Sequence, residues 1–142
     1  MPADDLTQRL VNEIRLRAYD DHYIDRTEER EILQIAVAVG LGLDPARQTL
    51  ARICGEQGYV LESDVVASVK AAVEAAARDK RIDRAAFEGL VDQAKFATGG
   101  KRTDRDLRKL VIAVMEETGH TRVRTGWFTD WYATAKKELG IG

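Results

Sequence analysis

The chain has 142 residues, of which 44% are hydrophobic and 32% charged, and its basic and acidic side chains leave a net charge of −2. This composition excludes a disordered chain, and the near-neutral charge argues against a general polyanion binder. Because no apolar run reaches the roughly 18 residues of a membrane span, we expect no membrane insertion. The single cysteine, Cys54, cannot form an intramolecular disulfide, and the first residues lack the pattern of a signal peptide. We therefore expect a cytoplasmic protein that forms one domain over residues 1–142.

Helices are predicted along the first sixty residues. A stripe that repeats every four residues predicts the first helix: Leu6, Leu10, Ile14 and Ala18. Asp25 stands three residues before Glu28 and predicts a capping box at the start of a second helix. The buried face of that helix is predicted to hold Ile32, Ile35, Ala36 and Val39. Asp44 before Pro45 predicts the start of a third helix, which runs to about Gln57.

Four more helices are expected in the second half. The fourth follows a connector at residues 58–61 and ends near Asp79. The fifth begins after Asp83 and stops at Gly99 and Gly100. The sixth begins after Thr103 or Asp104 and ends at Gly119, and the seventh covers about residues 127–139. The stretch 120–125 favours an extended backbone, which makes at most one short strand. The sequence therefore predicts an all-α fold of about seven helices.

An internal repeat relates the two halves. When the chain is compared with itself at an offset of 58 residues, seven identities fall within residues 18–42. They are Ala18/Ala76, Asp21/Asp79, Ile24/Ile82, Asp25/Asp83, Arg26/Arg84, Ala36/Ala94 and Gly42/Gly100. Each copy reads as three helices, with repeat one over about 5–57 and repeat two over about 63–118. We expect the repeats to pack across an internal pseudo-twofold axis, because each alone leaves an apolar face uncovered.

The hinge in each repeat resembles the Asp-Gly-x-Ile-Asp-x-x-Glu junction of the TerB-like family, named for tellurite-resistance proteins. The first copy matches at Asp21, Ile24, Asp25 and Glu28, and the second at Asp79, Ile82 and Asp83. His22 and Lys80 stand where the family prefers glycine. The resemblance covers about residues 5–115 and implies a duplicated helical fold in a stress- or defence-associated system. It also implies an option to bind a divalent metal ion, which would rest on Asp20, Asp21, Asp25 and Glu28.

The last forty residues carry the richest surface chemistry. Residues 1–31 have a net charge of −4, whereas residues 101–142 have a net charge of +3. The basic and aromatic side chains that gather there are His120, Arg122, Arg124, Trp127 and Trp131. Trp and Arg commonly anchor protein interfaces, so these five residues are the candidate contacts with a protein partner or a second copy. Alternatively, the aromatic side chains pack the seventh helix onto the bundle.

A helix-turn-helix interpretation is a second option. The stretch 36–53 contains a helix, a glycine turn and another helix, and such motifs can read nucleic acid. Its candidate contacts are Arg47 and Arg52, with Arg122 and Arg124 as further cations. The acidic region before this stretch argues against it.

The sequence contains no recognisable catalytic motif. We expect Cys54 to be a buried small side chain rather than a nucleophile. We expect no enzyme activity and no cofactor apart from the metal option above. The favoured hypothesis is a helical protein-interaction or scaffolding module.

Overall fold

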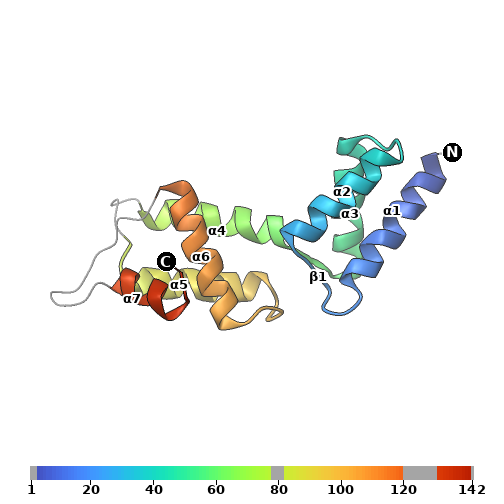
Figure 1. Ribbon diagram of the computed structural model, residues 1–142. Helices are drawn as coiled ribbons and strands as arrows, with labels where there is room; N and C mark the ends of the chain where they lie inside the picture. Colours follow the sequence, from blue (N-terminus) through green and yellow to red (C-terminus); the bar gives the residue numbers. More distant parts are fainter. Residues whose placement is uncertain (1–2, 78–81, 120–130, 142) are drawn as a thin grey trace. The chain divides into compact units, whose positions relative to one another are not determined.

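The computed structural model describes residues 3–77, 82–119 and 131–141 (Figure 1). Seven helices and one two-stranded sheet make up this part of the chain, which confirms the predicted all-α class. The chain divides into two compact units, residues 1–64 and 65–142. The boundary lies near the predicted junction between the repeats, whereas the pseudo-twofold axis stays a prediction.

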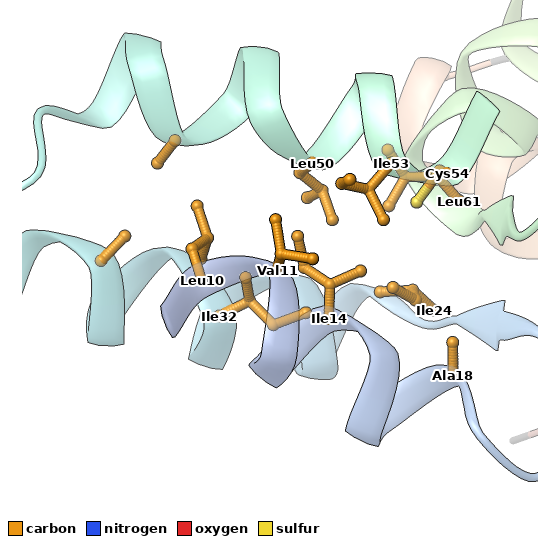
Figure 2. Packing of buried hydrophobic residues seen from close by; sticks show 12 residues of the cluster. Leu10, Val11, Ile14, Ala18, Ile24, Ile32, Leu50, Ile53, Cys54 and Leu61 are labelled. Atoms are coloured by element: carbon orange, nitrogen blue, oxygen red, sulfur yellow. The ribbon is translucent and has the colours of Figure 1, made fainter. Parts of the chain in front are cut away.

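Three helices and two short strands form the first unit: α1 (Ala3–Ala18), β1 (Tyr23–Ile24), α2 (Arg26–Ala38), α3 (Leu43–Gln57) and β2 (Val60–Leu61). All three helices contact one another. Figure 2 shows the buried core between them, to which α1 contributes Leu10, Val11, Ile14 and Ala18. The predicted stripe is therefore buried, except at its first residue, Leu6, which is half-buried. On α2, Ile32 and Ala36 are buried as predicted, whereas Ile35 and the C-cap residue Val39 are only half-buried.

The two strands pair in parallel, a contact that the sequence does not predict. Tyr23 lies opposite Val60, and Ile24 lies opposite Leu61. The backbone at His22, which precedes β1, is left-handed with φ at 53°. This is the geometry that glycine favours, and it falls at the position where the TerB-like pattern has glycine. The His22 ring lies 5.5 Å from the ring of Tyr59.

The start of α3 differs from the prediction. The helix begins at Leu43 with Gly42 as its N-cap, and no side chain caps it. Asp44 is therefore the second helical residue rather than the cap. Pro45 is the third, where a backbone N–H has no partner within the helix, so the helix can extend back past the proline. The carbonyl of Gly42 accepts the hydrogen bond from the Ala46 N–H at 3.0 Å.

The second unit takes most of α4 (Glu62–Ala76), which begins before the boundary, together with α5 (Arg84–Ala97), α6 (Asp104–Thr118) and α7 (Trp131–Glu138). Its buried residues include Phe87, Leu90, Val91 and Ala94 of α5 and Leu107, Val111, Val114 and Met115 of α6. The predicted starts of α5, after Asp83, and of α6, after Thr103 or Asp104, agree with the structure: Asp83 caps α5 and accepts from the Ala86 N–H, and Thr103 caps α6 and accepts from the Asp106 N–H. Gly119 ends α6 with φ at 77°, a conformation that other residues rarely adopt.

Within the described residues, no helix is both long and apolar enough to cross a membrane. The predicted end of α4 near Asp79, the extended stretch at 120–125 and the first residues of the predicted seventh helix lie outside the described residues.

Candidate functional site

The acidic hinge of the first unit is built as a helix cap. Asp25 accepts a hydrogen bond from the Glu28 N–H at 2.7 Å, and the Asp25 N–H donates to a Glu28 carboxylate oxygen at 3.1 Å. The Asp21 carboxylate accepts from the Tyr23 N–H at 3.1 Å. Burial, followed by the nearby charges of Asp25 and Asp21, raises the pKa of Glu28. These contacts give the carboxylates a structural role at the start of α2.

The structure does not gather the four predicted metal ligands, Asp20, Asp21, Asp25 and Glu28, into a cation site. In the described parts of the chain, no three His, Cys, Asp or Glu side chains are grouped so that they could hold a metal ion. The reason is local. The Asp25 carboxylate accepts the Glu28 N–H and the Glu28 carboxylate accepts the Asp25 N–H, as the capping box requires, so neither is turned toward a shared cation.

A buried tyrosine ties this hinge to the start of α4. The Tyr23 side chain is fully buried, and its hydroxyl donates to Glu62 at 2.5 Å. The other carboxylate oxygen of Glu62 accepts from the Arg26 N–H at 3.3 Å. Glu62 thus satisfies both the tyrosine hydroxyl and a free N–H in the first turn of α2.

Trp131 was expected as a contact for a partner, and the structure places it in the core of the second unit. Its side chain is only 7% exposed and packs on Phe87 of α5, with the ring centroids 5.1 Å apart. The helix α7 is held on α6 by an ion pair of 2.7 Å between Lys136 and Glu116. Arg105 also donates to the carbonyls of residues 138 and 139 at the end of α7. Trp131 therefore packs the seventh helix onto its unit, as the alternative interpretation expected.

The other four candidate contacts of this region, His120, Arg122, Arg124 and Trp127, lie outside the described residues. Their part in a partner interface stays a prediction.

The two arginines of the nucleic-acid alternative belong to different surroundings. Arg52 forms an ion pair with Glu56 one turn further along α3, at 3.5 Å. Arg47 lines a groove of the first unit to which Arg52 does not contribute. The nucleic-acid alternative stays a prediction.

The groove that contains Arg47 lies in the first unit, and the sequence does not predict it. It has a volume of about 810 Å³ and is walled by α2 and the start of α3. Its lining residues are Arg26, Glu29, Arg30, Leu33, Gln34, Val37, Ala38, Leu43, Arg47 and Ser63. The residues from α2 recur at helical spacing over the whole length of the helix, so they form one face.

The floor of this groove is apolar and open to solvent. Val37 is 54% exposed and Leu43 is 42% exposed, and both line the groove. Leu33 is half-buried at the same face, where it also packs on the core. A signal was present in the sequence, because Val37 falls outside the buried stripe of α2 that begins with Ile32.

The charged groups of the groove are mostly cationic. Among the described lining residues, Arg26, Arg30 and Arg47 are basic and Glu29 is the only acid. Glu29 accepts a hydrogen bond from the Ser63 hydroxyl at 3.1 Å. Among the described residues, none of the three guanidinium groups forms an ion pair. The groove therefore combines an uncovered apolar floor with three cations available for an outside anion.

The thiol of Cys54 is not set up as a nucleophile. Its side chain is buried in the core of the first unit. Burial, with the nearby carboxylates of Asp64 and Glu29, raises the pKa of Cys54 to about 11. The thiol therefore stays protonated at neutral pH, whereas nucleophilic attack requires the thiolate.

Comparisons with protein-family models, curated proteins and solved structures give no match for this chain.

Proposed function

We propose that this chain is a protein-interaction module and that its first unit docks one helix of a partner protein in the α2–α3 groove. The observation that carries the proposal is the apolar floor around Val37 and Leu43, which the first unit leaves open to solvent. Covering these side chains removes apolar surface from water, which favours association.

The length and walls of the groove suit a helix. Its lining residues on α2 run from Arg26 to Ala38, which corresponds to about 18 Å at 1.5 Å per residue, or roughly three turns of a docked helix. A helix satisfies its own backbone hydrogen bonds, whereas an extended peptide would press unpaired N–H and C=O groups against the apolar floor. An amphipathic helix in a groove is therefore the better occupant.

The link to a stress- or defence-associated system also remains a proposal. It is supported by the hinge pattern at Asp21, Ile24, Asp25 and Glu28 and by the left-handed backbone at His22. The docking proposal does not depend on it, because it rests on the groove alone.

A peptide selection tests the docking proposal. A displayed library of amphipathic helical peptides, with a fixed apolar stripe and random flanking positions, is selected on the full chain. Val37→Glu should weaken the binding of the selected peptides about tenfold or more, because the new carboxylate would lose its hydration at the apolar contact. Leu16→Glu is the matched control, since Leu16 is 69% exposed on α1 and lies outside the groove.

Both variants should keep the circular dichroism and melting temperature of the parent, because the replaced side chains are exposed. Gel filtration of the parent and Val37→Glu distinguishes a partner from self-association, since a dimer formed through the groove would dissociate in the variant. The docking function is wrong if two results are found together: no selected peptide loses more affinity for Val37→Glu than for Leu16→Glu, and gel filtration shows no dimer that depends on Val37.

A further inference from the structure

The charges of the α2–α3 groove are unevenly placed along its length. Arg26 and Arg30 occupy the first turns of α2, whereas Val37 and Ala38 occupy its last turn. Leu43 begins α3 directly after the short turn that ends α2, so it belongs to the same apolar end. Along α2, the groove thus has a cationic end and an apolar end.

From this polarity we infer that the docked helix is acidic at one end, with carboxylates that meet Arg26 and Arg30 while its apolar residues cover Val37 and Leu43. The inference rests on the docking function proposed above and names the chemistry of the partner. It goes further by fixing which part of the partner helix carries the charge.

The spacing of the carboxylates follows from helix geometry. Arg30 and Val37 are seven residues apart on α2, which corresponds to about 10 Å along the axis. A partner helix that lies along the groove has the same rise per residue. Its acidic residues should therefore stand about two turns from its main apolar anchor.

A third cation comes from α3. Arg47 lies one turn beyond Leu43 on this helix and lines the same groove as Arg26 and Arg30. Glu29, the only acid among the lining residues that the structure describes, already accepts a hydrogen bond from the Ser63 hydroxyl. Carboxylates are well matched to guanidinium groups, which can bind both oxygens at once.

A peptide carboxylate fits this groove better than a nucleic-acid backbone. Phosphate binding needs cations that follow the spaced charges of a polyanion, whereas here the apolar side chains of Leu33, Val37 and Leu43 share the groove with the arginines. Arg52, the other cation predicted for nucleic acid, lies outside the groove.

The test uses the peptides selected on the full chain, compared by fluorescence anisotropy with synthetic versions whose acidic end is changed to Gln or to Lys. The acidic version should bind tightest and the Lys version weakest. The double variant Arg30→Gln/Arg47→Gln should weaken the binding of the acidic peptide roughly 2- to 30-fold, as expected for the loss of two partly exposed ion pairs. It should leave the affinity for the Gln peptide unchanged. Arg52→Gln is the control on α3 for the single Arg47→Gln variant, because each removes one positive charge and Arg52 lies outside the groove.

Each result decides a separate point. The acidic partner is overturned if Val37→Glu weakens binding of the selected peptides and yet these carry no excess of acidic residues about two turns from the apolar anchor, or bind equally well as Gln versions. Either result leaves the docking function intact. Loss of Val37-sensitive binding overturns the docking function itself. Duplex DNA binding that weakens steeply with salt, depends on both Arg47 and Arg52 and survives Val37→Glu would assign the surface to nucleic acid and overturn the inference.

Discussion

Replacement of Trp131 by alanine separates a core role from a surface role for this residue. The side chain is 7% exposed and packs on Phe87 in the second unit. A buried Trp covers roughly 200 Å², which at about 25 cal/mol per Å² amounts to roughly 5 kcal/mol as an upper value. Core Trp→Ala replacements cost about 3–5 kcal/mol. We expect Trp131→Ala to lower the free energy of unfolding of the second unit by that amount.

The loss should begin at α7. This helix has only eight residues, too few to be stable without packing, so removal of its main buried side chain should release it from α5. The remaining contacts, such as the Lys136–Glu116 ion pair, are partly exposed and contribute little by themselves. Protection of the α7 amides in hydrogen exchange should therefore fall before that of α6.

The assay is urea unfolding followed by circular dichroism, together with hydrogen exchange. Thr134→Ala is the control on the same helix, because Thr134 is exposed and its replacement should change the free energy of unfolding by less than about 0.5 kcal/mol. A double-mutant cycle with Phe87→Leu should give a coupling of about 0.5–1.5 kcal/mol for the ring pair. If Trp131→Ala costs less than about 1 kcal/mol and leaves α7 protected, the buried placement of Trp131 is refuted.

Two further predictions concern the caps and the acid stability. Asp25→Ala and Asp83→Ala should each lower the free energy of unfolding in urea by about 1 kcal/mol, because each carboxylate accepts an N–H in the first turn of its helix. Asn at either position should retain most of that stability, since its side-chain oxygen can also cap. An equal loss with Asn would contradict the capping role. Hydrogen bonds from Arg108, at 2.7 and 2.8 Å, hold the pKa of Glu88 below its ordinary value of 4.5. A lowered native pKa stabilises the fold above pH 4.5, and that contribution is lost as the pH falls through the lowered pKa. The stability gap between the parent and Arg108→Gln should therefore narrow below pH 4.5, and a gap independent of pH would contradict the pairing.

Local features were predictable because neighbouring residues contain all the information they need. The capping box at Asp25 and Glu28 is formed by residues three apart, and the glycine at the end of α6 reflects its own backbone preference. The helical class follows in the same way from apolar spacing. One local prediction, the cap at Asp44, was wrong because the first helical turn tolerates proline at its third residue, so α3 begins at Leu43, two residues earlier than predicted.

The candidate site could not be predicted, because it depends on which faces the helices cover. The sequence alone determined the helical class, the capping box at Asp25 and Glu28 and most of the apolar stripes. Only the tertiary structure decided that Trp131 is buried, that Tyr23 reaches Glu62, and that Val37 and Leu43 stay exposed in a groove that also holds arginines. The physical reason is that burial of a side chain is set by residues distant in the chain, whereas a helix and its caps are set by residues within a few positions of one another.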